Sequence, residues 1–441
     1  MQTSTSKTAE SVRDVIRYLQ KFKNALVVIY LDDKTIESPL YSSHIRDIGL
    51  LHEAGLQVVI IPGARRRIDE VLSGKNISWS YHENIRVTNS EAMPLIKMAA
   101  FDVSNTIMTS LAANNITAII GNWVRSRGKG VIDGFDYGTA GEIDKLEVDA
   151  IKTVLNHGFI PIFPCIGWNS VGHPYNISSI LLAQQVAINL KADKLFFVMD
   201  KGGINSERYD IPQNFALSEN GDIPAMTLEE VDDFLNKTTV DDSTKGILKT
   251  AQQACKNGVT RVHIVDGNLD GVLPCEIFSG LGSGTMIYTS NYGKVRPMAR
   301  TDLPSVLGIM RPFVASGKLL PRTEQQLEDS FEDFVVYELD GGVYACAALH
   351  KYSDGQAEIA AVAVDENFAH MGIGPKLIEA VIAKAETVSA KSIFIMTTQA
   401  ADWFESLGFE KDDVDTLPAE RKAVWTKERN SKVYRLVRKL K

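Results

Sequence analysis

The chain has 441 residues, enough for two or three domains with buried cores, and its hydrophobic fraction of 44% and charged fraction of 23% are ordinary for a globular protein. Its formal net charge is −8 and no long basic run appears apart from the short tail YRLVRKLK, which argues against nucleic acid or a membrane surface as the main partner. The start MQTSTSKTAESVRDV lacks the apolar core of a signal peptide, and no apolar stretch approaches the ~20 residues that span a bilayer. We therefore expect a cytoplasmic protein.

The four cysteines show no paired spacing and mostly sit in apolar runs. A disulfide framework or a zinc site needs clustered cysteines, so this spacing favours buried free thiols in a reducing compartment and no metal site. The residues are Cys165, Cys255, Cys275 and Cys346.

The first half of the chain predicts an α/β domain. Residues 1–24 contain an amphipathic helix whose apolar stripe packs on a partner subunit or on its own domain, and the pattern does not choose between them. From residue 25 to 288, short β-branched runs that are apolar on both faces alternate with helical periods, which is typical of a mostly parallel sheet covered by helices on both sides. The expected strands are ALVVIYL, LQVVIIPG, ITAIIGNW, FIPIFPCIG, KLFFVMD and VTRVHIVDG, and the expected helices include SSHIRDIGLLHEAG and ISSILLAQQVAINLKA.

The second half predicts a compact α+β domain. The polar, Gly- and Pro-marked stretch YTSNYGKVRPMARTDLP contains the linker, placed at residues 289–294, and ends in a helix-start signal within the domain 295–441. Two helices are expected first, followed by strands joined by the hairpin turns ELDGG and KYSDGQ. A helix from Pro375 to about Thr387, the strand KSIFIMTT and the helix AADWFESLGF complete an antiparallel meander followed by β-α-β-α.

A glycine-bearing turn follows the strand AEIAAVAV and opens the next helix, in the stretch ENFAHMGIGPKL. Exposed amide groups at a helix start, together with the helix dipole, bind phosphate or pyrophosphate without charged side chains, and Gly372 and Gly374 let the backbone approach closely. The pattern is neither a Walker loop nor a complete G-x-G-x-x-G fingerprint. By itself it is equally typical of a structural turn.

The order of meander, glycine turn, helix, the strand IFIMTT and WFESLGF resembles the GNAT acetyltransferase family over about residues 295–441. The resemblance implies that the turn grips the pyrophosphate of acetyl-CoA, that the preceding strand contacts the pantetheine arm, and that Phe404 packs near the acyl end. Ala369 stands where the family usually has Arg or Gln, so His370 or Lys376 would supply charge. Acetyl-CoA is then a cosubstrate, and no cofactor is tightly bound. The acetyl-CoA residues so implied are Val362, Ala363, Val364, Ala369, His370, Met371, Gly372, Ile373, Gly374 and Phe404.

The first half resembles the amino-acid kinase family in its strand order and in the stretches IIPGARRRIDEVL and GLGSGTMI, which implies an αβα sandwich. That family opens with a Lys-x-Gly-Gly strand end that holds the transferred phosphoryl group. Here Tyr30 takes the lysine position and Asp32 and Asp33 replace the glycines, so two carboxylates would repel a nucleotide phosphate. The family's later aspartate is also absent, since Ser178 and Ser179 follow Tyr-Asn-Ile. We expect a kinase-like domain without kinase chemistry.

A silent kinase-like domain fused ahead of a GNAT domain is similar to the bacterial N-acetylglutamate synthase family over nearly the whole chain. The stretches that carry the resemblance are DIGLLHEAGLQVVIIPGARRRID, LLPR, DWFESLGF, and DTLPAERK near RNSKV. It implies direct transfer of acetyl from acetyl-CoA to the amino group of L-glutamate, the first step of arginine biosynthesis. It also implies a homo-oligomer, a hexamer in which the N-terminal helix links dimers.

The amino group of glutamate is mostly an ammonium at neutral pH, so a carboxylate near the acetyl group must take its proton. The resemblance points to Glu358 on the strand AEIAAVAV, which would otherwise be an ordinary exposed strand carboxylate. Thr397, at the end of IFIMTT, is the candidate donor to the leaving thiolate, although a threonine at a strand end is more often structural. Cys346 could form an acetyl-enzyme, but a buried thiol is the usual case in VYACAAL, so we favour direct transfer.

The two carboxylates of glutamate suit arginines that converge from separate elements, because a guanidinium binds a carboxylate bidentately. Each arginine alone is more typical of a solvated surface charge. The glutamate-binding residues implied by the resemblance are Leu320, Arg322, Arg429, Ser431 and Arg421, the last of which serves either glutamate or CoA.

The resemblance also implies L-arginine as a feedback inhibitor at the kinase-like domain, where its guanidinium needs a carboxylate such as Glu276. The implied effector residues are Glu276, Gly280, Gly282 and Lys201, with Lys245 as a weaker candidate. Three alternatives stay open: a working acetylglutamate kinase, a GNAT enzyme for another amino acid or amine, and a non-catalytic amino-acid sensor.

Overall fold

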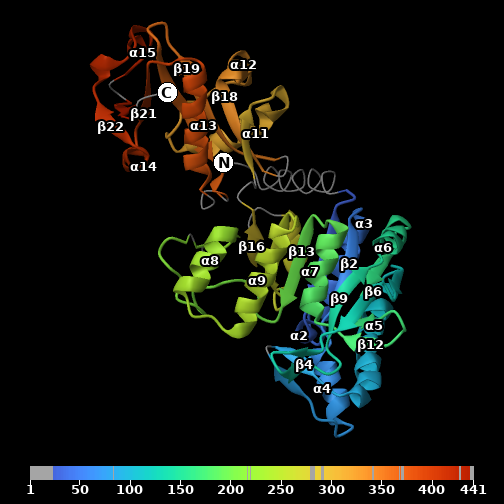
Figure 1. Ribbon diagram of the computed structural model, residues 1–441. Coiled ribbons are helices and arrows are strands. Elements are labelled where there is room, and N and C mark those ends of the chain that lie inside the picture. The colour runs from blue at the N-terminus through green and yellow to red at the C-terminus, as the bar shows by residue number, and fades with distance from the viewer. Residues whose placement is uncertain are drawn as a thin grey trace. The chain divides into compact units, whose positions relative to one another are not determined.

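The computed structural model describes residues 23–82, 84–215, 217–218, 220–278, 284–289, 293–339, 342–366, 368, 372–426 and 429–437. The chain divides into two compact units, Met1–Ser290 and Asn291–Lys441, and each is taken by itself below (Figure 1). Residues 1–22, which hold most of the predicted N-terminal helix, and residues 290–292 of the predicted linker lie outside the described residues.

An eight-stranded sheet forms the centre of the first unit, in the order β14-β16-β15-β13-β1-β2-β10-β5. Strand β1 (Leu26–Leu31) pairs in parallel with β2 (Gln57–Pro62) on one side and with β13 (Lys194–Met199) on the other. Within this sheet, only β15 and β16 pair in an antiparallel way, which confirms the predicted α/β class with a mostly parallel sheet. The remaining strands are β5 (Ala118–Ile120), β10 (Ile160–Ile162), β14 (Ala225–Thr227), β15 (Arg261–Asp266) and β16 (Gly284–Tyr288).

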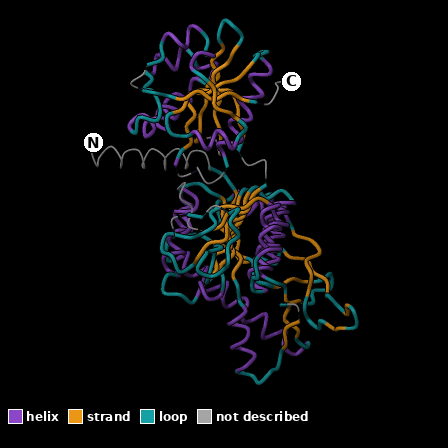
Figure 2. Tube along the Cα trace, turned by 90° about the vertical axis from the view of Figure 1, so that its left-hand side faces the viewer, coloured by secondary structure: helices purple, strands orange, loops and turns teal. Residues whose placement is uncertain are grey.

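Helices cover both faces of this sheet, as Figure 2 shows. Alternate side chains of β1 enter two separate cores, because successive residues of a strand point to opposite faces. Val28 and Tyr30 pack with α6, α7, α8 and α9, whereas Ile29 and Leu31 pack with α3, α5 and α10. The helices are α2 (Asp33–Ile36), α3 (Tyr41–Glu53), α4 (Arg65–Ser73), η1 (Ser90–Ala92), α5 (Met93–Ala112), α6 (Val148–Asn156), α7 (Ser179–Leu190), α8 (Leu228–Lys237), α9 (Asp242–Lys256) and α10 (Val272–Phe278).

A second, four-stranded sheet in the order β12-β11-β6-β9 was not predicted. Two of its strands, VRSRG and GEIDKL, carry charges, and the other two, IGW and PYN, have only three residues each, so none of them shows an extended apolar pattern. The predicted strand FIPIFPCIG is in fact two strands in different sheets, with Pro164, which lacks an N–H donor, between them. The strands outside the main sheet are β3 (Ser80–His82), β4 (Ile85–Val87), β6 (Val124–Gly128), β7 (Val131–Ile132), β8 (Phe135–Asp136), β9 (Gly141–Leu146), β11 (Ile166–Trp168) and β12 (Pro174–Asn176).

A seven-stranded sheet in the order β17-β18-β19-β20-β21-β23-β22 forms the second unit. Its strands from β17 to β20 are antiparallel neighbours, and β20 and β21 are parallel, which confirms the predicted α+β meander. The strands are β17 (Lys294–Pro297), β18 (Phe334–Leu339), β19 (Gly342–Lys351), β20 (Gln356–Val364), β21 (Ser392–Thr397), β22 (Phe409–Asp412) and β23 (Lys432–Leu436). The helices are η2 (Arg300–Asp302), α11 (Leu303–Ala315), α12 (Glu324–Asp329), η3 (Phe331–Asp333), α13 (Ile373–Thr387), α14 (Ala401–Ser406), η5 (Val414–Thr416) and α15 (Ala419–Ala423).

The sheet of the second unit opens between β20 and β21. The pairing of the two strands ends at Ile359 and Ile395, although β20 continues to Val364. In addition, β20 bulges against β19 just after Ala360, where Ala361 has a φ of +53°. A bulge bends a strand and re-aims the residues that follow it. The last residues of β20 therefore present a backbone edge that β21 does not cover.

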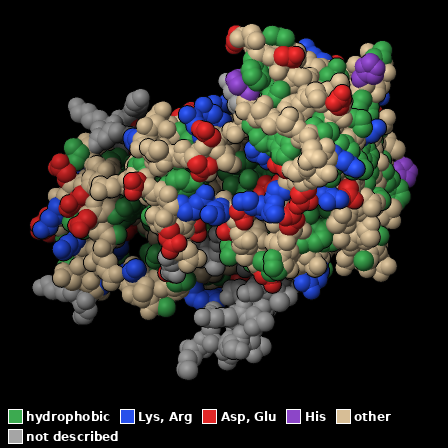
Figure 3. All heavy atoms as spheres, turned by 90° about the horizontal axis from the view of Figure 1, so that it is seen from below, with side chains coloured by type: hydrophobic (Ala, Val, Ile, Leu, Met, Phe, Trp, Pro, Cys, Tyr) green, Lys and Arg blue, Asp and Glu red, His purple; other side chains and the backbone are tan. Residues whose placement is uncertain are grey.

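The surface and the thiols agree in part with the sequence analysis. Acidic and basic side chains are interspersed on the face drawn in Figure 3 rather than gathered by sign. The predicted burial is confirmed for Cys165, Cys255 and Cys346. It is wrong for Cys275, which is exposed on α10, a helix that faces the core with other side chains.

Candidate active site

Glu358 lies on β20 and is only 5% exposed, so it is not an ordinary exposed strand carboxylate. Its Oε2 accepts hydrogen bonds from the Tyr352 hydroxyl at 2.6 Å and from Arg421 Nε at 2.8 Å. Burial, and then the charge of Glu358, raise the pKa of Tyr352 far above its ordinary value, so this hydroxyl stays a donor. Both donors hold the same carboxylate oxygen. The other oxygen, Oε1, is left to accept a proton.

Arg421, which was expected to bind glutamate or CoA, is the cation nearest to the candidate base. It lies on α15, and its Nε forms an ion pair with Glu358 in which the two side chains are 17% and 7% exposed. A guanidinium that pairs with the carboxylate of a candidate base orients that base.

His350 faces Glu358 across the β19–β20 pair, in which the two residues are direct partners on one face of the sheet. The imidazole Nε2 accepts a hydrogen bond from Arg322 Nη2 at 3.1 Å, and Nδ1 lies 2.7 Å from Asp333 Oδ2. The sheet face thus carries the candidate base next to a linear array of Asp333, His350 and Arg322.

The Arg322 side chain is half-buried, and this burial lowers its pKa from the ordinary value while the charge of Glu358 acts in the opposite direction. Its Cζ lies 5.5 Å from the ring centre of Phe334. Among the described residues it makes one hydrogen bond, to His350, and no ion pair. A guanidinium has five N–H donors, so this group retains donors for an anionic ligand.

The other residues expected to bind glutamate lie around the segment that precedes Arg322. Arg429 Nη2 donates to the carbonyl oxygen of Lys318 at 3.2 Å, which places the guanidinium beside that segment. Leu320 is 53% exposed, and Ser431 is buried, with its carbonyl oxygen 3.3 Å from the indole nitrogen of Trp425.

Thr397 ends β21 and organises the turn after it, since its hydroxyl oxygen accepts the backbone N–H of Ala400 at 3.0 Å and that of Gln399 at 3.4 Å. With its lone pairs occupied, the hydroxyl proton remains available for donation. Cys346 is fully buried, and burial raises the pKa of its thiol to about 12. A thiol that stays protonated is a poor nucleophile, which disfavours an acetyl-enzyme at this residue.

The glycine turn leads into α13. Gly372 caps the helix with a φ of +62° and no side-chain hydrogen bond, and a Cβ at this position would meet open space. A Cβ on Gly374 would lie 2.9 Å from the Trp403 ring, so glycine there allows α14 to pack closely on the helix start. Phe404 is buried between Trp403 and Phe409, at ring distances of 4.7 and 5.7 Å. Ala369, His370 and Met371 lie outside the described residues, whereas Val362, Ala363 and Val364 end β20 and Ile373 begins α13.

In the first unit, Glu276 accepts a hydrogen bond from His263 Nδ1 at 2.8 Å, and both side chains are buried. Burial lowers the pKa of His263 to about 4 although Glu276 acts in the opposite direction, so the imidazole is neutral near pH 7. The lysine whose charge also acts on this ring is Lys194, a buried residue of β13. Lys201 lines a different cleft, Lys245 is exposed on α9, and Gly280 and Gly282 lie outside the described residues.

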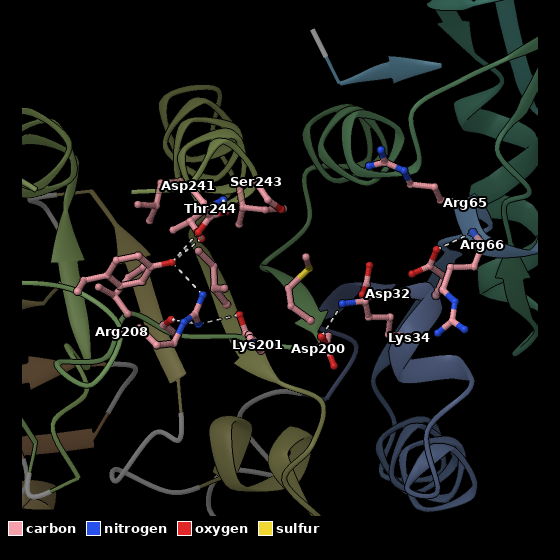
Figure 4. Close-up of a pocket in the computed structure, with 18 of the residues that line it drawn as sticks. Asp32, Lys34, Arg65, Arg66, Asp200, Lys201, Arg208, Asp241, Ser243 and Thr244 are labelled. Atoms are coloured by element: carbon pink, nitrogen blue, oxygen red, sulfur yellow. Dashed lines mark hydrogen bonds and ion pairs between the residues drawn. The ribbon is translucent and has the colours of Figure 1, made fainter. Parts of the chain in front are cut away.

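That cleft, of about 740 Å³, lies at the carboxyl ends of β1 and β13 (Figure 4). Asp33 Oδ2 accepts the backbone N–H of Arg66 at 2.8 Å, at the start of α4, and Lys34 pairs with Asp200 at 2.8 Å. The Tyr30 hydroxyl donates to Asp32 at 3.1 Å, and burial followed by the charge of Asp33 raises the pKa of Asp32 to about 6. A helix N-terminus attracts anions, and here a carboxylate of the chain itself occupies it.

Three residues around Glu358 were missed by the sequence analysis, namely Tyr352, His350 and Asp333. The hairpin turn KYSDGQ is the signal that could have found one of them, because its register sets His350 opposite Glu358. Tyr352 and Asp333 sit in a turn and a short helix, whose side-chain directions have no periodic pattern. In the first unit, His263 was missed because it lies in an apolar strand, whose pattern predicts burial but not a polar contact.

Neither a metal cluster nor a membrane span is found in the part of the chain that the structure describes. No three His, Cys, Asp or Glu side chains converge there as ligands of one ion. None of the helices there has the length and hydropathy that a bilayer crossing requires.

Comparison with known proteins identifies the family. Residues 27–266 match the amino acid kinase family, and residues 330–411 match the acetyltransferase (GNAT) domain. An amino-acid acetyltransferase of Escherichia coli (strain K12) is 32% identical over 438 residues, and the alignment covers 97% of each chain. The corresponding protein of Salmonella typhimurium is 31% identical over 439 residues, with 97% of each chain covered.

Two solved structures of N-acetylglutamate synthase from Neisseria gonorrhoeae are 27% identical to this chain and cover 98% of it and 99% of their own length. The complex with coenzyme A and L-arginine has a TM-score of 0.77, and the complex with coenzyme A and N-acetyl-glutamate has a TM-score of 0.61. This chain belongs to the amino-acid acetyltransferase family, an enzyme with an amino-acid kinase-like domain and a GNAT N-acetyltransferase domain.

Proposed function

We propose that this chain is an N-acetylglutamate synthase, which transfers the acetyl group of acetyl-CoA to the amino group of L-glutamate. The observation that carries the proposal is one sheet face on which Glu358 lies next to the half-buried guanidinium of Arg322; among the described residues, Glu358 Oε1 has no hydrogen-bond donor and Arg322 has no carboxylate partner. A base for an ammonium and a site for a carboxylate are what an acidic amino acid requires. Coenzyme A and N-acetyl-glutamate, bound by the Neisseria enzyme, are the two products of this reaction.

Acetyl-CoA binds along the opening between β20 and β21. Its pantetheine amides pair with the uncovered backbone of residues 362–364, and its pyrophosphate lies at the start of α13, where Gly372 leaves room. Residues 369–371 would complete this turn, and Phe404 would pack near the acyl end. These assignments rest on the open strand edge and on the helix start, where the N-cap residue Gly372 provides no side-chain hydrogen bond.

The transfer is direct. Glu358 Oε1 takes a proton from the glutamate ammonium, the free amine attacks the thioester carbon, and a tetrahedral intermediate forms. The C–S bond then breaks and its electron pair leaves with sulfur, while the extra proton on the attached nitrogen passes to that sulfur through the Thr397 hydroxyl, which gives the neutral amide and the CoA thiol. The high pKa of the Cys346 thiol favours this route over an acetyl-enzyme.

The acceptor's carboxylates bind from separate elements, one at Arg322 and the other at Arg429, with Ser431 and the Leu320 backbone beside them. Arg421 is reassigned from substrate binding to holding Glu358. Paired arginines favour a small dicarboxylate over a protein lysine as the acceptor.

L-Arginine acts as a feedback inhibitor at the first unit, near Glu276, with Gly280 and Gly282 in the adjacent turn. The arginine bound by the Neisseria enzyme supports L-arginine as the effector, whereas the assignment of Gly280 and Gly282 to its site rests on the sequence alone. We place the N-terminal arm at 1–24, the silent kinase-like domain at 25–288, the linker at 289–294 and the catalytic domain at 295–441. A cytoplasmic location and a hexamer belong to the same proposal.

Kinase activity is the second candidate, and the cleft of Figure 4 argues against it, because Asp33 already occupies the start of α4. One experiment distinguishes the proposal from a GNAT enzyme for another amine and from a non-catalytic sensor. Purified protein is given acetyl-CoA and L-glutamate, L-glutamine or other amines, with and without L-arginine, and free-thiol release is followed. We expect release that depends on glutamate and falls with arginine. An absence of release with glutamate would overturn the proposal.

A further inference from the structure

The partner of the Arg322 guanidinium is an imidazole and not a carboxylate. An arginine that is partly withdrawn from water, as the half-buried Arg322 is, usually pairs with an acidic side chain, because a desolvated charge without a partner is costly. Here Nη2 donates to His350 Nε2 at 3.1 Å, and the described residues provide no other hydrogen bond to the group. The guanidinium is therefore oriented without being neutralised.

The protonation state of His350 follows from its two neighbours. Asp333 Oδ2, 2.7 Å from Nδ1, can only accept when ionised, so Nδ1 carries the hydrogen. Arg322 can only donate, so Nε2 is the acceptor. The neutral Nδ1–H tautomer satisfies both contacts, whereas a doubly protonated ring would point an N–H at the guanidinium.

Both ends of this array are anchored. Lys384 Nζ on α13 donates to the carbonyl oxygens of Glu332 and Asp333 at 2.5 and 2.9 Å, which fixes η3. At the other end, Thr323 and Gln326 form a capping box at the start of α12, immediately after Arg322. An array fixed at both ends holds its central ring in one orientation.

We propose that His350, fixed by Asp333, is a positioning residue that orients the Arg322 guanidinium for one carboxylate of the acceptor amino acid. Because His350 is neutral, the positive charge of the guanidinium stays available to that carboxylate. This rests on the proposed function, since the carboxylate is that of L-glutamate. A neutral acceptor aims the arginine and leaves its remaining donors to the substrate, whereas an acidic partner would compete with the substrate carboxylate for the same charge.

Three substitutions of His350 separate orientation from charge. His350→Gln retains a neutral acceptor and should keep the KM for glutamate within about twofold of the wild-type value. His350→Leu removes the acceptor and should raise that KM about tenfold, the loss expected for a charge-assisted hydrogen bond. His350→Glu retains an acceptor but adds a charge, and should raise it at least as much. The kcat and the KM for acetyl-CoA should stay within about twofold in all three.

Several results would overturn the proposal. If His350→Glu matched His350→Gln, the neutrality of the partner would not matter; if kcat fell with KM unchanged, His350 would act on the chemistry instead. His157→Leu, at an exposed histidine of the first unit, is the matched control.

If His350→Leu does not fold, Asp333→Asn tests the same array and should raise the KM for glutamate severalfold without changing kcat. Absence of glutamate-dependent release by the wild-type protein marks failure of the proposed function, whereas normal release by the wild type and unchanged KM values in the variants mark failure of this inference alone.

Discussion

Glu358 holds one carboxylate oxygen in place and keeps the other free, and this asymmetry suits a base that must present one lone pair to an ammonium. Tyr352 and Arg421 both bond to Oε2, so a rotation of the carboxylate that would bury Oε1 costs two hydrogen bonds. Replacement of the acid by its amide keeps the shape and removes the basicity.

Glu358→Gln should lower kcat by about 10²- to 10⁴-fold, the range for loss of a general base, with little change in the KM for acetyl-CoA. Steady-state thiol release over a range of pH is the measurement. Glu410→Gln, the same change at an exposed strand position of the same unit, should leave kcat unaltered. A Glu358→Gln variant with more than a tenth of wild-type kcat would remove this residue from the mechanism.

The ion pair between Arg421 and Glu358 should be revealed by coupled substitutions. Arg421→Met leaves a buried carboxylate without its cation and should destabilise the second unit by about 3 kcal/mol. Addition of Glu358→Gln should restore much of that stability, because the unpaired charge is gone, but should not restore activity. Urea unfolding of the wild type, both single variants and the double variant gives the coupling energy. Additive effects would mean that the two side chains do not interact in solution.

At the scale of elements, β15 and α10 meet through His263 and Glu276, and this contact makes the first unit sensitive to acid. The pKa of His263 is about 4 in the folded protein, against about 6.5 for a free histidine. Below about pH 6.5 the unfolded chain takes up a proton that the folded chain does not, so the stability contributed by the neutral ring is lost as the pH falls towards 4.

Between pH 7.5 and pH 5, this histidine alone should therefore decrease the free energy of unfolding by about 2 kcal/mol. His263→Gln removes the titrating group, so this variant should lose less stability over this pH interval than the wild type. The same holds for the double variant His263→Gln/Glu276→Gln. Urea unfolding at both pH values measures the difference. If the free energy of unfolding fell equally in the wild type and in His263→Gln, groups other than His263 would cause the loss of stability at low pH.

The sequence was a better guide to elements than to side-chain partners. Strands β1, β2 and β13 are apolar on both faces, so their sequences predict a buried parallel sheet. The charged strands β6 and β9 carry no such pattern, and they were missed.

The same limit applies to the site. The position of Glu358 came from a family resemblance, but its contacts with Tyr352 and Arg421 depend on a hairpin end and on a short helix 63 positions later. A one-dimensional pattern carries no information on such a pairing. Lys194, whose charge acts on His263, was not considered in the sequence analysis, since a lysine buried in a strand has no signature that distinguishes it from the apolar residues around it.

At the scale of the whole molecule, inhibition requires that a ligand in the first unit alter a reaction in the second, and this coupling is reciprocal for binding. Glu276→Gln should abolish the response to L-arginine and leave the uninhibited kcat within about twofold, because the substituted residue lies outside the catalytic unit. Thiol release titrated with arginine is the measurement, and Glu229→Gln, at the start of α8, is the control. A variant that remained inhibited would place the effector elsewhere.

The carboxylate of Asp33 at the start of α4 has a consequence for what the first unit can sense. This carboxylate belongs to the chain itself, so it remains at the helix start at any concentration of ligand in solution. A triphosphate entering from solution would have to displace it and would then meet Asp32 and Asp200 nearby. A nucleoside triphosphate should therefore bind poorly at the start of α4, because the amide there is already satisfied from within the chain.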